Sequence, residues 1–339
     1  MGSSDRLRPD AALEARKALD LPGVRAGVTT PRAIAPGERL SLRDHDAYVS
    51  VTMEFRCNLR CVHCMIEGTM DRLQPTPAPL FDKVLEEQRV HRRWRGLILT
   101  GSEITLRADL PDLARAARAA GFERVRIQTH GVHLSRPGYA DRLLEAGVNE
   151  FFVSVAGAGA ASHDAITQVP GAWDKMLAGM EYLDRHEDVR LLTNTVITSL
   201  CYRDLPEIVA ALGHLERLVQ MEFWNFFPMA ERDDKRLAVA FPELMPYLRA
   251  AILAARAAGR FVEVKNVPEC LMGELSDALV NAQPLLMIDP AFWQEFDRNQ
   301  FHRCPHRAAC ASTECLGLTP AYIARFGDEA EQLHPLISD

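Results

Sequence analysis

One stretch near residue 60 decides the fold of this 339-residue chain. It reads Met53-Glu54-Phe55-Arg56-Cys57-Asn58-Leu59-Arg60-Cys61-Val62-His63-Cys64. Its three cysteines stand four and then three residues apart, just after a β-like run at 47–53, so a short loop brings three sulfur atoms together. Three thiolates suit an iron–sulfur cube in which each binds one iron and the fourth iron stays open. A zinc site completed by His63 or by a distant ligand is the alternative.

The composition is that of an ordinary globular protein, with 47% hydrophobic and 25% charged residues. A formal net charge of −7 provides no basic surface of the kind that binds nucleic acid, so no nucleic-acid partner is expected. The sequence has no apolar run of about 18 residues, and its first residues are polar, so we expect a cytoplasmic protein without a membrane partner. A reducing compartment favours metal ligation or reactivity over disulfides for the eight cysteines.

Short β-branched runs alternate with longer helical runs between about residues 46 and 260. This alternation predicts an α/β fold with a parallel sheet or barrel. Strands are expected at 48–53, 97–100, 125–129, 151–155, 191–197 and 221–226. Helices are expected at 80–94, 110–120, 139–146, 173–186, 205–218 and 242–258. Six such units fall short of the eight of a closed TIM barrel, and their number alone does not distinguish a partial barrel from an open doubly wound sheet.

The ends of the first two predicted strands carry the motifs that suggest a family. The C-x3-C-x2-C loop follows the first strand, and Thr100-Gly101-Ser102-Glu103 follows the second. Together they resemble the radical S-adenosylmethionine (radical SAM) enzymes. The resemblance implies a partial (βα)6 TIM-like barrel over 46–262, after a lead-in segment at 1–45. A cysteine-rich auxiliary-cluster domain is expected at 263–339.

The same resemblance implies a cofactor site. A 4Fe-4S cluster on Cys57, Cys61 and Cys64 would bind S-adenosylmethionine through its open iron, and His63 fills the position before the third cysteine that is usually aromatic or His. Gly101-Ser102-Glu103 resembles the family's Gly-Gly-Glu motif, with Ser102 in place of the second Gly. The acid of that motif holds the ammonium group of the cofactor. A solvated loop acid is the alternative for Glu103.

Polar residues at later strand ends extend the predicted cofactor site. Ser154 resembles a ribose contact, and Asn194 and Val196 lie on a strand that runs beside the cofactor in the family. A strand-end serine bonded to backbone is the alternative for Ser154. His163-Asp164 resembles a pair common in close relatives and is expected to cap a helix or anchor a loop.

Two residues are candidates for catalysis. His130 ends the third predicted strand in Thr129-His130-Gly131, where it is expected either to contact substrate or transfer a proton, or to occupy a structural turn. Cys201 lies after the fifth predicted strand. A thiol there could donate a hydrogen atom to a substrate radical, and a small buried cysteine is the alternative.

A second cysteine group follows residue 262. It comprises Cys270, Cys304, Cys310 and Cys315. Four thiolates ligate either a 4Fe-4S cluster or zinc, and the lack of paired C-x2-C knuckles favours the cluster. The ending Cys315-x-Gly317 … Tyr322 … Phe326-Gly327 resembles the SPASM and twitch extensions of radical SAM proteins. With four ligands, one auxiliary cluster is implied.

The resemblance predicts reductive cleavage of S-adenosylmethionine to a 5′-deoxyadenosyl radical that abstracts hydrogen from a substrate. A small-molecule natural product or metabolite is expected, because no peptide-recognition domain is evident at 1–45. Maturation of a ribosomally made peptide, by crosslinking or epimerisation, is the alternative. A flavodoxin- or ferredoxin-type protein is the expected electron donor. Outside catalysis, the alternatives are a zinc-stabilised binding protein and a cluster-bearing scaffold without turnover.

Overall fold

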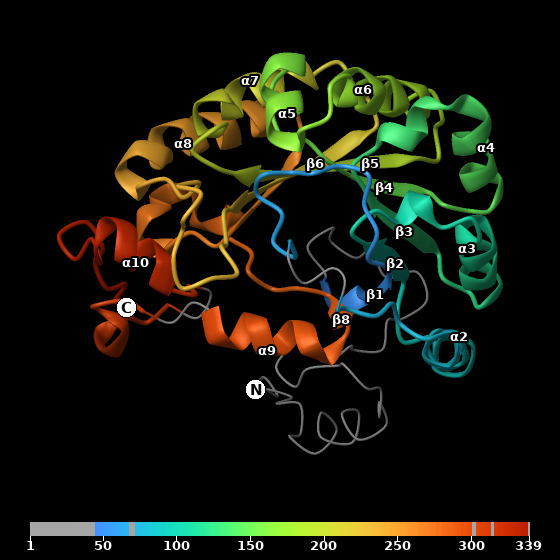
Figure 1. Cartoon of the computed structure of the whole chain (residues 1–339), viewed down its shortest axis with the longest axis horizontal. Helices are drawn as coiled ribbons and strands as arrows, with labels where there is room; N and C mark the ends of the chain where they lie inside the picture. The colour runs from blue at the N-terminus through green and yellow to red at the C-terminus, as the bar shows by residue number, and fades with distance from the viewer. Residues whose placement is uncertain (1–44, 68–71, 300–302, 313–314, 338–339) are drawn as a thin grey trace, which may run out of the picture.

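The computed structural model describes residues 45–67, 72–299, 303–312 and 315–337. Eight parallel strands form one sheet in the order β7-β6-β5-β4-β3-β2-β1-β8. They are β1 (Tyr48–Glu54), β2 (Gly96–Gly101), β3 (Arg124–Thr129), β4 (Glu150–Ser154), β5 (Arg190–Ile197), β6 (Leu218–Asn225), β7 (Phe261–Lys265) and β8 (Leu285–Met287). The sheet curls into an arc rather than a closed barrel (Figure 1). The predicted α/β partial barrel is therefore confirmed.

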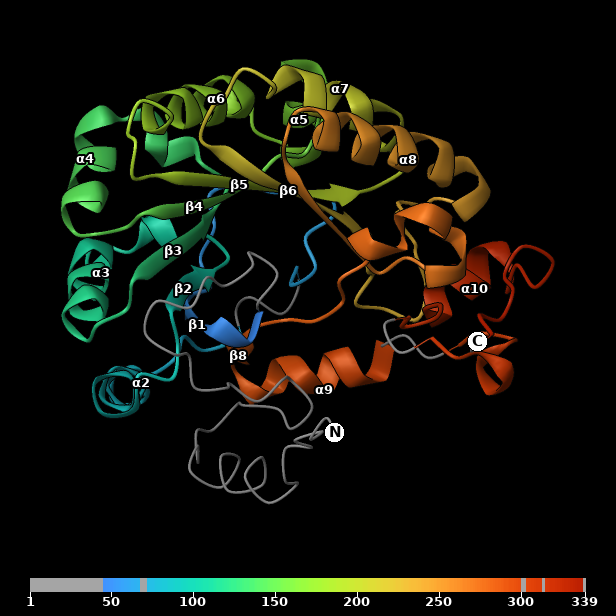
Figure 2. The same ribbon diagram turned by 180° about the vertical axis from the view of Figure 1, so that it is seen from behind.

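Helices cover the convex side of this arc. They are α2 (Ala78–His91), α3 (Leu110–Ala119), α4 (Pro137–Glu145), α5 (Ala160–Thr167), α6 (Ala172–Leu183), α7 (Leu205–Ala211) and α8 (Phe241–Ala257). Helices α9 (Pro290–Asn299) and α10 (Pro320–Phe326) follow later in the chain. Figure 2 shows α3 to α8 following the outer side of the sheet, while α9 lies across its open side. Several helices have proline as their first or second residue, because its fixed φ suits the first turn and its missing N–H has no partner there anyway.

The predicted strands are all present, and the structure adds two more. β7 and β8 extend the sheet at its two edges, and β8 pairs with β1. The sheet thus continues past residue 262, where the auxiliary domain was expected to begin. The predicted helix at 205–218 was wrong in length, because α7 ends at Ala211 and Leu218 starts β6, in register with Leu191. The lead-in segment at 1–45 lies almost entirely outside the described residues.

The two faces of the sheet differ in polarity. Side chains on the convex face, such as Val49, Val51 and Met53, are buried in one apolar core beneath the helices. Alternate residues of the same strand, Ser50 and Thr52, point to the concave face. Parallel sheets are usually apolar on both faces. The concave face of this sheet is therefore unusual, because it carries polar side chains where a parallel sheet normally carries apolar ones.

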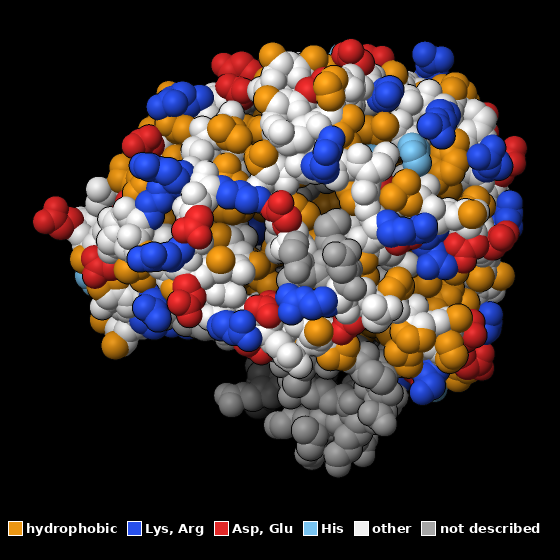
Figure 3. Space-filling view, viewed as in Figure 1, with side chains coloured by type: hydrophobic (Ala, Val, Ile, Leu, Met, Phe, Trp, Pro, Cys, Tyr) orange, Lys and Arg blue, Asp and Glu red, His pale blue; other side chains and the backbone are white. Residues whose placement is uncertain are grey.

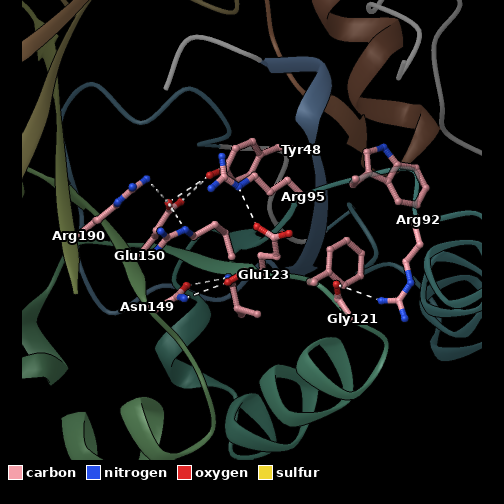
Figure 4. A network of polar contacts seen from close by, with 12 residues as sticks. Tyr48, Arg92, Arg95, Gly121, Glu123, Asn149, Glu150 and Arg190 are labelled. Carbon is pink, nitrogen blue, oxygen red and sulfur yellow. Dashed lines mark hydrogen bonds and ion pairs between the residues drawn. The ribbon is translucent and has the colours of Figure 1, made fainter. Parts of the chain in front are cut away.

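A buried ionic network closes the amino-terminal end of the concave face. Glu150 on β4 lies 2.9 Å from Arg126 and accepts hydrogen bonds from the Tyr48 hydroxyl at 3.1 and 3.0 Å. Arg190 approaches the same carboxylate at 3.6 Å. Figure 4 shows Tyr48 and Arg190 converging on Glu150, with Arg95 and Glu123 paired nearby. This network links β1, β3, β4 and β5 at the end opposite to the cysteine loop.

The surface carries charges of both signs. Figure 3 shows Lys and Arg side chains interspersed with Asp and Glu over one face of the molecule. In the part of the chain that the structure describes, none of the helices combines the length and apolarity needed to cross a membrane.

Candidate active site

Glu54, the last residue of β1, fixes the start of the cysteine loop. Its Oε1 accepts hydrogen bonds from the backbone N–H of Phe55 at 3.0 Å and of Arg56 at 2.9 Å. The Arg56 guanidinium lies 2.6 Å from Oε2. Burial disfavours the charged form of Glu54, but the bonds from Arg56 outweigh it and keep the pKa of this carboxyl below its usual value. The chain therefore leaves the strand in a fixed direction just before Cys57.

The middle of the loop is bound to the last turn of α5. The N–H of Arg60 donates to the carbonyl of Thr167 at 3.1 Å, and the N–H of Val62 donates to that of Ile166 at 3.0 Å. The last carbonyls of a helix have no partner within the helix. Helix α5 therefore supplies acceptors that hold the loop from outside.

The three cysteines of the loop are near one another and half-buried. Burial raises the pKa of Cys61 to about 12, and the neighbouring Cys57 and Cys64 add to the rise. Burial also raises the pKa of Cys57, with smaller contributions from Glu103 and Cys64. Three thiols whose ionisation is opposed by burial and by one another suit a metal centre, because a metal stabilises the thiolate form.

The end of β2 packs against the end of β1. The Ser102 N–H donates to the carbonyl of Glu54 at 2.8 Å, and the Glu103 N–H donates to that of Arg56 at 3.1 Å. A Cβ atom on Gly101 would lie 2.0 Å from the carbonyl oxygen of Glu54, so only glycine fits. The Ser102 hydroxyl is buried without a hydrogen-bond partner among the described residues. The predicted motif thus lies directly beside the cysteine loop.

Glu103 is fully buried, so the alternative of a solvated loop acid was wrong. Its carboxylate accepts hydrogen bonds from the N–H and hydroxyl of Thr105, from the Thr129 hydroxyl at 2.7 Å and from the His130 N–H at 2.8 Å. These bonds orient one carboxylate between the ends of β2 and β3. A role in holding the cofactor ammonium group stays a prediction.

His130 links this acid to the cysteine loop. Its Nε2 lies 3.1 Å from Oε2 of Glu103 and 2.8 Å from Oδ1 of Asn58. Burial lowers the pKa of His130, against an opposing effect of Glu103. The imidazole therefore joins the ends of β1, β2 and β3, and a catalytic role stays a prediction.

The residues predicted on β4 and β5 share the concave face. Ser154 ends β4 with an exposed side chain and stands in register with Asn194 of β5. Oδ1 of Asn194 is buried without a partner among the described residues. Val196 lies two residues further along and is partly exposed on the same face. Of these residues, Asn194 thus offers this face a hydrogen-bond acceptor that no described residue uses.

Cys201 lies in a small apolar cluster with Ala156 and Ile166, against which Val62 of the cysteine loop packs. Only 1% of the residue is exposed, and its thiol donates to the carbonyl of Val196 at 3.4 Å. Burial raises the pKa of this thiol. These surroundings match the alternative of a small buried cysteine. The hydrogen-donor role stays a prediction.

The four C-terminal cysteines come from separate segments that meet. An isolated antiparallel bridge joins Arg303 to Leu318 and so brings the neighbourhood of Cys304 to that of Cys315. Ser312 bonds to Glu269, the residue before Cys270, and accepts from the Cys315 N–H at 3.0 Å. The neighbourhoods of three of these cysteines are thereby joined.

The fourth member, Cys310, is tied to the end of the described chain, since its sulfur accepts from the Leu336 N–H at 3.4 Å. Burial raises the pKa of Cys270, and Cys315, Cys304 and Cys310 contribute to the rise. A set of four half-buried thiols that act on one another fits a four-thiolate centre. Within the described ranges, no three His, Cys, Asp or Glu side chains are grouped as ligands of a single metal ion.

Sequence reasoning missed two parts of the site. Glu54 and Asn58 were not singled out, although both lie in the opening stretch. The period of two along β1 places Glu54 on the same face as Ser50 and Thr52, and that signal could have found it. No signal in the sequence pairs Asn58 with His130, because that contact joins residues 72 positions apart.

Comparison with known families decides the class of the domain. A model described as the Radical SAM superfamily matches residues 52–217, from within β1 to just before β6. This chain carries a radical SAM domain. The members of this superfamily are enzymes. The family predicted from the sequence is therefore confirmed.

Curated relatives of the radical SAM domain include two archaeal enzymes. An "AdoMet-dependent heme synthase" of Methanosarcina barkeri is 34% identical over 176 residues, which cover 50% of this chain and 47% of the relative. A "Probable GTP 3',8-cyclase" of Methanopyrus kandleri is 32% identical over 170 residues, which cover 50% of this chain and 53% of the relative. The chain thus spans about half the length of these relatives.

A solved structure supports the fold. The FeFe-hydrogenase maturase HydG from Carboxydothermus hydrogenoformans aligns with a TM-score of 0.51 at 11% identity, covering 71% of this chain and 57% of that one. At this level of identity the likeness concerns the partial barrel alone.

Proposed function

We propose that the chain uses Cys57, Cys61 and Cys64 to hold a 4Fe-4S cluster and acts on a small-molecule natural product or metabolite. The observation that carries the proposal is the meeting of three mutually interacting thiols with the fixed carboxylate of Glu103 at adjacent strand ends. When bound, the reduced cluster and S-adenosylmethionine would supply a radical able to remove an unactivated hydrogen atom. We expect a flavodoxin- or ferredoxin-type protein to deliver the electron.

The chain's own residues would bind the S-adenosylmethionine and orient it. Glu103 offers a negative charge that matches the ammonium group of a methionine moiety, and His130 keeps that carboxylate beside the loop. Asn194 provides a buried amide oxygen without a partner among the described residues, which suits the hydroxyl or amino group of a nucleoside. The buried ion pair of Arg126 and Glu150 occupies the closed end of the concave face.

A small-molecule substrate is supported by the relatives. The names of the two matched proteins refer to the synthesis of heme and to the cyclisation of GTP. Heme and GTP are both small molecules. We further propose that Cys270, Cys304, Cys310 and Cys315 hold one auxiliary 4Fe-4S cluster that assists in redox steps. Four cysteine ligands suit a fully ligated cluster.

Metal analysis after anaerobic purification tests the cofactor assignment. About eight irons per chain, with a spectrum that changes on reduction, is the expected result for two four-iron clusters. Zinc without iron would refute the proposal in favour of a zinc-stabilised binding protein.

Turnover is tested with dithionite and S-adenosylmethionine. Formation of 5′-deoxyadenosine is expected in the native chain and should be abolished by Cys57→Ala. Cys315→Ala should leave this cleavage detectable, because only the auxiliary site is altered. Equal loss in both folded variants would contradict the division between the two cysteine groups, and no product in the native chain would indicate a scaffold without turnover.

A further inference from the structure

The concave face carries a row of polar side chains that extends beyond the proposed cofactor site. Four residues stand in register on the adjacent strands β4, β5, β6 and β7, namely Ser154, Asn194, Glu222 and Glu263. Phe223 and Val264, the residues that follow the two acids, enter the apolar core on the convex side, so Glu222 and Glu263 point to the concave side. The row therefore continues past Asn194 to two carboxyl groups that have no part in the proposed cofactor site.

Glu222 is fixed by two neighbours on its own strand. Its carboxyl accepts the Gln220 Nε2–H at 2.8 Å and the Trp224 indole N–H at 2.7 Å, and only 4% of the residue is exposed. Gln220 is also buried, and its Oε1 has no hydrogen-bond partner among the described residues. Because the same amide is bonded to Glu222, this unused oxygen stays beside the Glu222 carboxyl.

Glu263 of β7 is fully buried. Its Oε2 lies 3.4 Å from the Lys265 ammonium group and 3.2 Å from Nε2 of His45, whereas its Oε1 has no partner among the described residues. Lys265 also donates to the carbonyls of Val280 at 2.7 Å and Ala282 at 3.1 Å. The three N–H groups of this ammonium therefore have acceptors already, while one oxygen of Glu263 has no donor.

The charges around the two acids favour ionisation of Glu263 but not of Glu222. Burial raises the pKa of Glu222, and the carboxyl of Glu263 adds to the rise. Burial also opposes ionisation of Glu263, but His45 and Lys265 outweigh it and lower the pKa of that carboxyl. Arg126, whose charge also interacts with that of Glu222, belongs to the ionic network at the closed end. A further positive charge beside Glu222 would let this acid ionise.

The unused hydrogen-bonding positions around the two acids are acceptors. They are Oε1 of Gln220 and Oε1 of Glu263. The side-chain nitrogens of Gln220, Trp224 and Lys265 already donate to an acceptor in the protein. A ligand that satisfies these positions has to bring N–H or O–H donors, and one that also lets Glu222 ionise has to bring positive charge. A primary ammonium group provides both, with three N–H donors and one charge.

We propose that Glu222, together with Gln220 and Glu263, binds a primary ammonium group of the substrate. Because Glu222 is in register with Asn194 on the neighbouring strand, the amine would lie beside the nucleoside part of S-adenosylmethionine. This narrows the substrate class to small metabolites that carry a free amino group. The inference rests on the proposed function for the identification of the ligand as a substrate, whereas recognition of an ammonium group is a property of the protein alone.

The first test compares two probes of equal length. n-Butylamine carries a primary ammonium group at pH 7, and n-butanol is its neutral analogue. Saturation-transfer NMR measures their binding to the anaerobically purified full-length chain. Butylamine should bind about tenfold more tightly than butanol, the effect of one hydrogen bond between charged groups. Equal affinities for the two probes, or no binding of butylamine, would overturn the proposal.

The second test assigns the binding to Glu222. Glu222→Gln has the shape of the protonated acid and cannot ionise, so it should keep the fold and bind butylamine about tenfold more weakly. Glu216→Gln removes an exposed negative charge and should bind butylamine as the native chain does. Equal butylamine affinities in the native chain and in Glu222→Gln, with thermal unfolding unchanged, would overturn the proposal, as would equal losses in both variants.

The third test follows the proton of Glu222 in the native chain by carbon-13 NMR of labelled glutamate carboxyl groups. The Glu222 signal, assigned from its loss in Glu222→Asp or Glu222→Gln, should move toward the ionised position when butylamine is added at pH 7. An unmoved signal would overturn the proposal even where the Gln variant does not fold. A chain that binds no iron and forms no 5′-deoxyadenosine would refute the proposed function, while these measurements would still decide whether Glu222 recognises an ammonium group.

Discussion

At the scale of single residues, the site depends on the close approach of two strand ends. Gly101 lies where the carbonyl of Glu54 leaves no room for a side chain, and this approach lets Ser102 bond to β1. The sequence predicted the cysteines and Glu103 because their spacing and chemical types are distinctive. It did not predict the bonds from Thr105 and Thr129 to Glu103, because hydroxyl groups at strand ends are common.

Gly101→Ala is expected to lower the free energy of unfolding by about 2 to 3 kcal/mol, because the new methyl group would overlap backbone and force the loop to move. Urea unfolding of the purified chain measures the change. Gly138→Ala is the control, since no atom lies within 4 Å of its added Cβ and it occupies α4. That variant should be neutral or more stable by about 0.5 to 1 kcal/mol. Equal losses in both would contradict the steric argument.

At the scale of elements, the alternation of strands and helices was readable because each strand is a β-branched run beside a longer helical one. β7 and β8 were missed for different reasons. β8 has three residues, too few to show a period, and its pairing with β1 bridges more than 200 positions. β7 begins with exposed Phe261 and continues with alternating Glu263 and Lys265, which is unusual for a parallel strand.

Glu150 joins four strands, and its removal should be costly. Glu150→Gln is expected to lower the free energy of unfolding by about 3 to 5 kcal/mol at pH 7, because Arg126 would be left buried without its counterion. Glu123→Gln, which alters the exposed partner of Arg95 in the same region, should cost less than about 1 kcal/mol. Comparable losses of unfolding free energy in Glu150→Gln and Glu123→Gln would contradict the assignment of Glu150 as the central anion of the network.

The effect of Glu150 should depend on pH. Burial opposes its ionisation, but Arg126 and Arg124 outweigh burial and hold the pKa of this carboxyl below its usual value. A lowered pKa in the folded state contributes stability above the unfolded pKa of about 4.3, and this contribution is lost as pH falls through the folded pKa. The difference between native chain and Glu150→Gln should therefore narrow below about pH 4. A constant difference from pH 7 to pH 3 would count against this prediction.

At the scale of the whole molecule, the C-terminal segment is attached to the barrel through α8 and α10. The Phe241 N–H donates to the Tyr322 hydroxyl at 2.8 Å, and the Tyr322 hydroxyl donates to Glu329 at 2.8 Å. The two aromatic rings stack with centroids 4.7 Å apart, and Arg325 pairs with Asp233. The second cysteine group is thus carried by a segment in direct contact with the barrel.

Tyr322→Phe should lower the free energy of unfolding by about 1 to 2 kcal/mol, since it removes one hydroxyl that both accepts and donates. Hydrogen exchange should show faster exchange at the start of α8 and over 320–336. Tyr182→Phe removes a hydroxyl bonded to Asp141 outside this contact and should leave exchange in these segments unchanged. Unaltered exchange in Tyr322→Phe would show that other contacts hold the segment.

The pairing of β8 with β1 has a consequence for synthesis on the ribosome. Strand β1, which leads into the cysteine loop, can pair with β8 only after residues 285–287 have left the ribosome. Until then β1 is an edge strand, with unpaired backbone groups that can recruit other chains. Chains that stop between β7 and β8 should therefore be prone to aggregate, and a chaperone that shields this edge would favour correct folding of the nascent protein.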